Sequence, residues 1–189
     1  LNQVYDFKRD DRFLGVLPFF HSLGFTATLI GPTILGVGAA YHPLPTDTRS
    51  ISKLIPHYKL TLLLATPTFL QLYLRKIKPE EMKSVNLVVV GAEKMPQRLA
   101  EAFDEKFGLQ PLEAYGCTEC SPGVSVNTPN VAVEGEVQSG NRPGTIGRAL
   151  PGISVKIVDP ETDKSCDFDH CYLSSVRSFR LSPSHNGRL

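Results

Sequence analysis

One short segment, residues 113–122 with the letters EAYGCTECSP, combines side chains that could hold a phosphorylated ligand. Gly116 would let the backbone approach a ligand closely, and the Thr118 hydroxyl could donate a hydrogen bond to a phosphate oxygen. Glu119 could hold Mg²⁺, which prefers carboxylate and phosphate oxygens. Tyr115 could stack on a flat ring. These residue types alone favour a nucleotide site and an ordinary strand–turn about equally.

The same segment supplies two of the four cysteines, Cys117 and Cys120, and the others are Cys166 and Cys171. Two such pairs could be interpreted as a zinc site. We favour ordinary cysteines, because the first pair belongs to the segment just described and the second lies in a compositionally unusual tail. The low cysteine count and the lack of a recognisable signal peptide predict a reducing, cytoplasmic location.

The charge pattern excludes some partners. The formal net charge is +1 and no polybasic run occurs, so we expect no nucleic-acid partner. Between Arg12 and Asp47 there is no charged residue. The apolar centre of this stretch, residues 24–40, is short for a bilayer span and contains Pro32, so we favour a mostly buried helix over a membrane-spanning one.

The elements that must position these residues alternate along the chain. Apolar runs predict strands at residues 13–17, 60–65 and 86–90, and two further short strands are expected at residues 39–42 and 112–114. Helices are predicted at residues 22–37, from Asp47 towards His57, from Pro67, and from Pro96 to Gly108. The pattern predicts an α/β fold with a parallel sheet flanked by helices on both faces. Ligands bind such sheets at the carboxyl ends of strands, where residues 91–93 and 115–119 fall.

The texture changes after residue 120, where Gly, Pro, Asn and Ser become more frequent. We predict a strand at residues 123–127, a turn-rich loop at 142–148 and a strand at 153–158. The predicted organisation is therefore an α/β portion over residues 1–120, a β-rich continuation over 121–164, and an irregular tail over 165–189 rich in Ser and Arg.

The letters YGCTE resemble the Y-G-x-T-E motif of the adenylate-forming, or AMP-binding, superfamily of acyl-activating enzymes. The segments LPFFHSLGF, VVVGAEKMP and RPGTIGRALPGISVKIVDPET strengthen the resemblance, since all four occur in the family's order. The resemblance covers about residues 8–164 and is closest to the bacterial acyl-[acyl-carrier-protein] synthetase and 2-acylglycerophosphoethanolamine acyltransferase branch. It implies part of the large N-terminal domain of such an enzyme, with a short β-rich C-terminal part.

The resemblance implies a role for each matching residue. Thr118, Glu119 and His21 would be catalytic, with Thr118 at the α-phosphate, Glu119 holding Mg²⁺ and His21 near the acyl carboxylate. Gly24 and Phe25 would line the acyl tunnel with His21. The nucleotide-binding residues would be Gly91, Ala92, Glu93, Glu113, Ala114, Tyr115, Gly116, Cys117 and Thr118.

Each role has a structural alternative. His21 could simply bond the backbone at a helix start, and Glu93 could face solvent. Arg142 and Arg148 are more typical of a turn surface than of a site.

The implied reaction is attack of a carboxylate on the α-phosphate of ATP, followed by transfer of the acyl group to a thiol. ATP and Mg²⁺ would be the cofactors, a fatty acid the substrate, and acyl carrier protein or coenzyme A the acceptor. The parent protein could associate with the inner face of the membrane. The alternative is a catalytically inactive nucleotide- or acyl-binding remnant.

Three family segments are not found: a Ser/Thr/Gly-rich loop ending in P-K-G, a Y-x-x-G-D segment, and a small C-terminal domain with its lysine. We therefore expect an incomplete piece of a ligase with little activity alone. The tail is expected to arise from a truncated or frame-shifted coding region.

Overall fold

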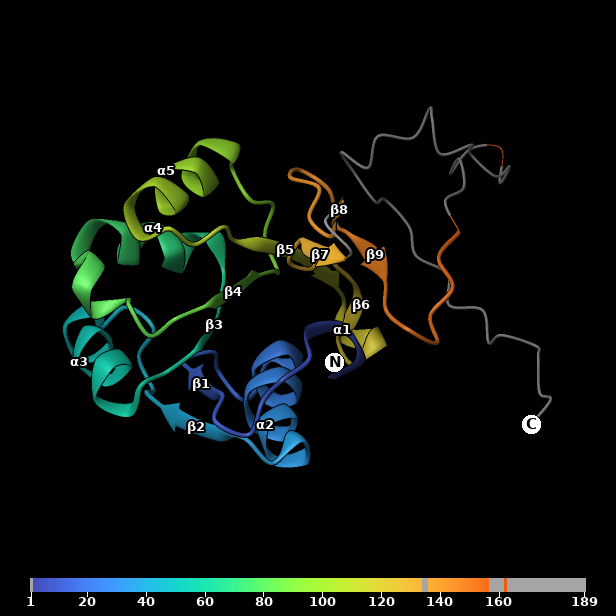
Figure 1. Cartoon of the computed structure of the whole chain (residues 1–189). Coiled ribbons are helices and arrows are strands. Elements are labelled where there is room, and N and C mark those ends of the chain that lie inside the picture. The colour runs from blue at the N-terminus through green and yellow to red at the C-terminus, as the bar shows by residue number, and fades with distance from the viewer. Residues whose placement is uncertain (1, 134–135, 157–161, 163–189) are drawn as a thin grey trace.

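The computed structural model describes residues 2–133, 136–156 and 162. Among them, seven strands form one sheet in the spatial order β2-β1-β3-β4-β5-β6-β9 (Figure 1). The strands are β1 (Arg12–Gly15), β2 (Gly38–Tyr41), β3 (Leu62–Ala65), β4 (Leu87–Val90), β5 (Leu112–Gly116), β6 (Gly123–Val126) and β9 (Arg148–Ala149). The neighbours from β2 to β5 are parallel, whereas β6 and β9 pair antiparallel. A hairpin of β7 (Val131–Val133) and β8 (Glu136–Gln138) stands apart.

Helices cover both faces of this sheet, which confirms the predicted fold class (Figure 1). On one face lie α3 (Thr48–Tyr58), α4 (Pro67–Lys76) and α5 (Gln97–Phe107). On the other lies a continuous helical segment, a π-helix η1 (Gly24–Ile30) followed by α2 (Gly31–Leu35). Short pieces complete the set: α1 (Asn2–Tyr5) and the 3₁₀ turns η2 (Pro79–Glu81) and η3 (Thr118–Cys120).

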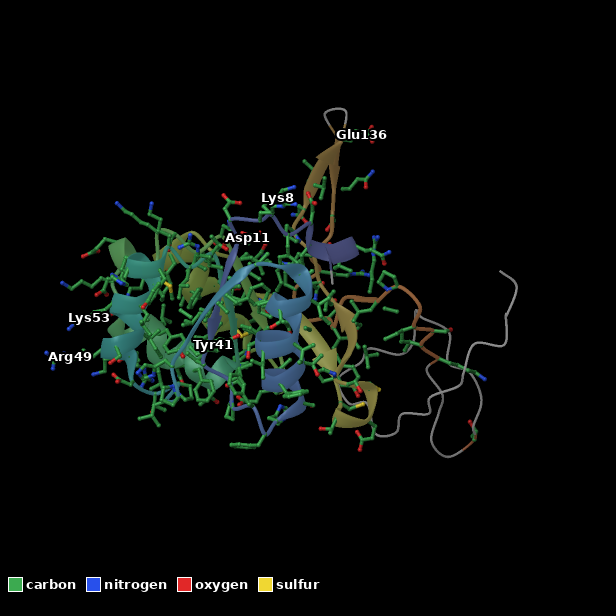
Figure 2. All side chains as sticks on the ribbon, turned by 90° about the horizontal axis from the view of Figure 1, so that it is seen from below. Lys8, Asp11, Tyr41, Arg49, Lys53 and Glu136 are labelled. Carbon is green, nitrogen blue, oxygen red and sulfur yellow. The ribbon has the colours of Figure 1, made fainter. Side chains whose placement is uncertain are left out.

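Local capping explains where the helices begin and end. The Asp47 carboxylate accepts a hydrogen bond from the Ser50 backbone amide at 3.1 Å and so starts α3, as predicted. Figure 2 shows Arg49 and Lys53 projecting away from this helix, while Ile51 and Ile55 on its other side are fully buried. An apolar stripe facing the sheet therefore fixes how α3 packs.

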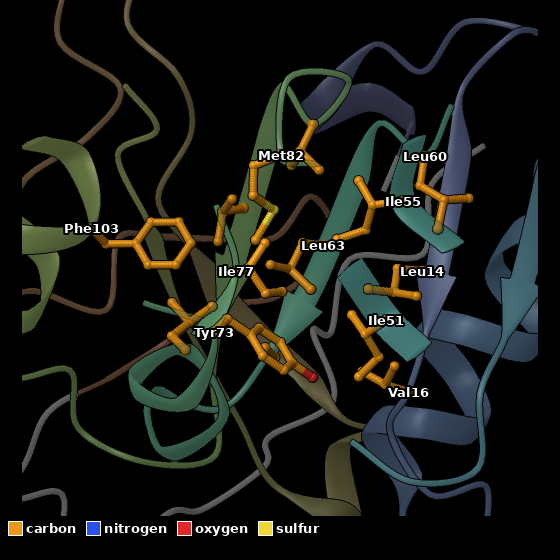
Figure 3. Close-up of a cluster of buried hydrophobic side chains, with 14 of the residues drawn as sticks. Leu14, Val16, Ile51, Ile55, Leu60, Leu63, Tyr73, Ile77, Met82 and Phe103 are labelled. Carbon is orange, nitrogen blue, oxygen red and sulfur yellow. The ribbon is translucent and has the colours of Figure 1, made fainter. Parts of the chain in front are cut away.

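The main core fills the space between the sheet and α3–α5 (Figure 3). Leu63 of β3 and Phe103 of α5 are fully buried there, as is Tyr73, whose hydroxyl donates to the Pro45 carbonyl at 2.9 Å. A second, smaller cluster of Leu17, Leu64 and Val89 lies on the opposite face, under η1. The central strands are thus buried on both faces, as their uninterrupted apolar runs predict.

The segment predicted as one mostly buried helix at residues 22–37 is helical, but much of it is exposed. Gly24, Thr28 and Pro32 are buried, whereas Phe25 is 47% and Ile34 is 79% exposed. The segment packs on the sheet along one side only, and no described residue covers its outer side. None of the helices in the described ranges is long and apolar enough to cross a bilayer.

The strand predicted at residues 153–158 is not found in its described part, residues 153–156, which have no regular structure. β9 ends at Ala149, and a turn at residues 151–152 then leads the chain away from its partner β6. Residues 157–158 and the tail predicted at 165–189 lie outside the described residues.

The double-sided core makes Leu63→Ala a test of the fold. Leu63 has no exposed surface, so we expect the substitution to lower the free energy of unfolding by roughly 2–5 kcal/mol. Leu44→Ala is the matched control, because Leu44 is 59% exposed and its loss should change stability by less than about 0.5 kcal/mol. Urea denaturation of both variants gives the comparison, and equal effects would contradict the assigned core.

Candidate functional site

A cavity of about 340 Å³ lies between the sheet and the η1 segment and extends along the sheet to the carboxyl ends of the parallel strands. Its apolar lining comes from sheet residues such as Phe13, Leu62, Leu64 and Val89, and from Leu23 and Ala27 of the helical segment. Polar groups gather where β5 ends, at Tyr115, Gly116, Cys117 and Thr118. The volume lies within the ~300–1,000 Å³ range of small-molecule sites.

The turn after β5 is held rigidly by its own backbone. The Cys117 amide donates to the Pro122 carbonyl at 2.9 Å, and the Cys120 amide donates to the Cys117 carbonyl at 3.0 Å. A side chain on Gly116 would bring its Cβ to 1.9 Å from the Pro122 carbonyl oxygen. Only glycine fits there, so the glycine of the motif allows β5 and the start of β6 to approach each other.

The segment after β1 meets this turn across 96 residues of sequence. The Ser22 hydroxyl donates to the Thr118 hydroxyl oxygen at 3.4 Å. His21 lines the cavity beside them, and its Nδ1 accepts a hydrogen bond from the Leu23 amide at 3.2 Å. His21 therefore bonds the backbone at a helix start and also faces the cavity, and its role near the acyl carboxylate stays a prediction.

Gly24 and Phe25 do not line the cavity. A Cβ on Gly24 would lie 2.2 Å from the Pro18 carbonyl oxygen, so this glycine lets η1 pack against the end of β1. Phe25 is 47% exposed, and the next two residues, Thr26 and Ala27, line the cavity instead.

Of the three residues after β4 that were expected to bind the nucleotide, one lines the cavity and two do not. Ala92 lines the cavity and has a left-handed backbone (φ 69°), a conformation that costs a non-glycine residue about 1–2 kcal/mol. Gly91 is buried behind the lining, and the Glu93 carboxylate accepts a hydrogen bond from the Thr68 hydroxyl at 2.7 Å. Glu93 thus lies on the exposed surface near the start of α4.

Glu113 supports the site from behind and does not line it. Its carboxylate accepts a hydrogen bond from the Gly144 amide at 2.8 Å, which ties β5 to the loop of residues 142–148. Ala114, the next residue, does line the cavity. Arg142 and Arg148 are exposed and do not contribute to the lining, in line with the turn-surface alternative.

The sequence analysis missed Asn127, which is 1% exposed and holds the same loop. Its Oδ1 accepts from the Arg142 amide at 2.9 Å, and its Nδ2 donates to the Thr145 carbonyl at 2.7 Å and to the Glu113 carbonyl at 3.1 Å. The available signal was a polar residue at the end of the strand predicted at residues 123–127.

Tyr5 was missed as well. It lines the cavity, and its hydroxyl donates to the Asn127 carbonyl at 3.0 Å. Burial raises the pKa of Tyr5 and that of Tyr115, which favours the neutral phenol at both positions. No sequence pattern joins Tyr5 to a residue more than 100 positions away.

For a metal, the described residues contain no group of three or more His, Cys, Asp or Glu side chains that could act together. Glu119 is exposed on η3 next to Thr118. A single carboxylate fits Mg²⁺, which keeps several waters and takes its other oxygens from bound phosphates. It does not fit a structural zinc ion, which needs four ligands.

Cys117 and Cys120 are free thiols whose sulfur atoms lie 3.0 Å apart. Burial, together with the Cys117 thiol, raises the pKa of Cys120 to about 11. The second cysteine pair lies outside the described residues.

The fold is that of an α/β protein with a cavity that reaches the carboxyl ends of its parallel strands, the place where sheets of this kind bind ligands. Residues 1–170 match the family of AMP-binding enzymes, and the chain belongs to that family. The family expected from the motifs is therefore confirmed.

Relatives of known name agree with this assignment. The chain is 27% identical over 171 residues to a long-chain-fatty-acid–CoA ligase of Bacillus subtilis. The matched region covers 88% of this chain and 29% of the relative. It is 30% identical over 160 residues to a medium-chain-fatty-acid–CoA ligase of Ectopseudomonas oleovorans, covering 80% of this chain and 28% of the relative. The chain thus spans less than a third of the length of these relatives.

Solved structures show the same fold. ATP-bound MatB from Rhodopseudomonas palustris superposes with a TM-score of 0.75 at 26% identity, over 88% of this chain and 31% of MatB. An anthranilate CoA ligase in complex with anthranoyl-AMP gives 0.75 at 25% identity, over 88% of this chain and 31% of that one.

The close approach at Gly116 generates a prediction. Gly116→Ala should lower the free energy of unfolding by about 1–3 kcal/mol, because the new methyl group meets backbone that cannot move aside without shifting the turn. Gly38→Ala is the control, since its Cβ would meet only the flexible Arg12 side chain at 3.2 Å. Chemical denaturation compares the two, and a Gly116 variant as stable as the Gly38 variant would contradict the rigid turn.

Proposed function

We propose that this chain is part of an ATP-dependent ligase that activates a fatty acid as its acyl-adenylate and then transfers the acyl group to a thiol. The observation that carries the proposal is the juxtaposition of His21 and Thr118 with an apolar cavity floor at the carboxyl ends of the strands. A polar turn suits the phosphate, and an apolar floor suits a greasy acyl chain. The names of the fatty-acid–CoA ligases similar to this chain support the same substrate class.

The nucleotide is assigned to the turn after β5. Ala114 to Cys117 would form one wall beside the adenine, with Tyr115 stacking on the ring. Ala92 would form the other wall, with Gly91 buried behind it. The Thr118 hydroxyl would donate to the α-phosphate. Glu113 and Glu93 would support the nucleotide site without contacting the nucleotide. Their carboxylates accept hydrogen bonds from the Gly144 amide and the Thr68 hydroxyl, respectively.

Glu119 is the residue that would hold Mg²⁺ through its carboxylate. A bound Mg²⁺ ion would neutralise negative charge on the phosphates. Thr118 next to it would fix the orientation of the α-phosphate relative to the acyl carboxylate.

The acyl group is assigned to the apolar part of the cavity, under η1. The His21 ring is oriented by the Leu23 amide at Nδ1, so a neutral ring carries its proton on Nε2 and could donate it to the acyl carboxylate. Thr26 and Ala27 would border the chain where Gly24 and Phe25 were expected.

The chemistry needs positioning more than activation, because a carboxylate is already a nucleophile. A carboxylate oxygen attacks the α-phosphorus, and the bond from that phosphorus to the bridging oxygen breaks to release pyrophosphate. A thiolate then attacks the acyl carbonyl carbon, and AMP leaves.

Coenzyme A is the favoured acceptor, because the relatives are named as CoA ligases, and acyl carrier protein is the alternative. A cytoplasmic location, with contact to the inner face of the membrane, is part of the same proposal.

The test is a calorimetric titration of the chain with a non-hydrolysable fatty acyl-adenylate analogue. Thr118→Ala should weaken binding roughly tenfold or more, since a hydrogen bond to a charged group contributes about 1.5–3 kcal/mol. Thr33→Ala is the matched control, because Thr33 is exposed on α2 and bonds only the Leu29 carbonyl of its own helical segment. Equal affinity of the two variants for the analogue would contradict the proposal that Thr118 binds the ligand.

A second candidate function, binding without turnover, follows from the remnant hypothesis. Assays of pyrophosphate release separate the two when run on the full-length parent chain. Release that depends on fatty acid and falls with Thr118→Ala supports the ligase. Tight binding without release supports the remnant.

A further inference from the structure

The two thiols of the turn after β5 are placed for a reaction that the ligase chemistry does not use. Cys117 and Cys120 flank Thr118 and Glu119, and their sulfur atoms are 3.0 Å apart. Both side chains are partly exposed, and Cys117 also lines the cavity. An oxidant can therefore reach the pair from solvent.

The backbone of the turn already meets the requirements of a disulfide. A bridged pair has Cα atoms about 4.4–6.8 Å apart. The Cys120 amide donates to the Cys117 carbonyl at 3.0 Å, and a turn closed by such a bond keeps its end Cα atoms within about 7 Å. The sulfur atoms need to approach by only about 1 Å to reach bonding distance.

No metal competes for these sulfurs among the described residues, since no third His, Cys, Asp or Glu joins them in a ligand group. The pair is therefore free to react as a dithiol.

We propose that Cys117 and Cys120 form a reversible disulfide across the turn that carries Thr118 and Glu119, and that this bond makes the site sensitive to redox conditions. The oxidant is a low-molecular-weight disulfide of the glutathione class. In the first step one cysteine sulfur, after losing its proton, attacks a sulfur of the oxidant and releases one small thiol, which takes up that proton. In the second step the other cysteine loses its proton, attacks the mixed disulfide and expels the second small thiol. The protein loses two electrons and two protons, and the oxidant gains both.

The bond would act on ligand binding through the residues it encloses. It closes a ring around Thr118 and Glu119 and draws the two sulfur atoms about 1 Å closer, which would shift the turn and with it the Thr118 hydroxyl that faces the phosphate. A ligand on Thr118 would in turn cover Cys117 and slow its oxidation, because coupling between two sites is reciprocal. This consequence rests on the proposed function, whereas formation of the disulfide does not.

The first experiment detects the bond itself. The full chain carrying Cys166→Ser and Cys171→Ser is incubated with oxidised glutathione, alkylated without reduction and weighed by intact mass spectrometry. We expect a product lighter by two hydrogen atoms that takes up no alkyl label, and full recovery of both labels after reduction. Adding Cys120→Ser should instead trap a glutathione adduct on Cys117. Two labels, or a lasting adduct with both cysteines present, would overturn the proposal.

The second experiment measures the coupling with the same acyl-adenylate analogue. The disulfide form should bind it more weakly by on the order of fivefold or more, and the analogue should slow oxidation to a similar degree. Equal affinity in both redox forms would overturn the switch. If the disulfide forms but neither redox form binds the analogue, formation of the disulfide is supported and the proposed nucleotide site is contradicted. If the disulfide does not form but the dithiol form binds the analogue, the redox proposal is wrong and the proposed nucleotide site is supported.

Discussion

Burial of the central strands on both faces is the constraint on which the rest of the structure depends. Along β3, Leu63 faces the core under α3–α5, whereas Leu64 faces the smaller cluster under η1. Val88 and Val89 of β4 divide in the same way. Each fully buried side chain of this size contributes about 1.5–3 kcal/mol, and successive residues of a strand point to opposite faces. Helices must therefore cover both sides, and all strand–helix connections follow from that.

The same constraint creates the site. Because β1, β3, β4 and β5 run parallel, their carboxyl ends meet at one edge of the sheet. The chain leaves the sheet there in short polar turns, and the segment after β1 comes within hydrogen-bonding distance of the turn after β5. The cavity keeps an apolar floor because its base is the smaller of the two cores. A polar rim above an apolar floor is the arrangement that suits the acyl-adenylate of the proposed function.

A second layer of contacts fixes the rim. Asn127 and Glu113 hold the loop of residues 142–148 through three hydrogen bonds to its backbone, and Asn127 also donates to the Glu113 carbonyl of β5. Neither side chain lines the cavity. A buried amide with all these partners specifies one loop position, since an unpaired partner would be costly. The turn with Thr118 is rigid for a related reason, because Gly116 lets the Pro122 carbonyl approach and bond the Cys117 amide.

The sequence by itself determined the order and type of most elements, because their signals are local. Short segments of three to six residues, most of them apolar, marked the five parallel strands. Asp47 marked the start of α3 and Gly108 the end of α5. The motif around Thr118 also placed that turn after a strand. Only the tertiary structure decided which side chains face the ligand. A helical segment with no charges looks uniformly buried in sequence, but its single packed side turns Thr26 and Ala27 inward and leaves Phe25 exposed. Tyr5, Asn127 and Glu113 gain their partners from segments distant in sequence, and such long-range pairing is set by packing and not by local pattern.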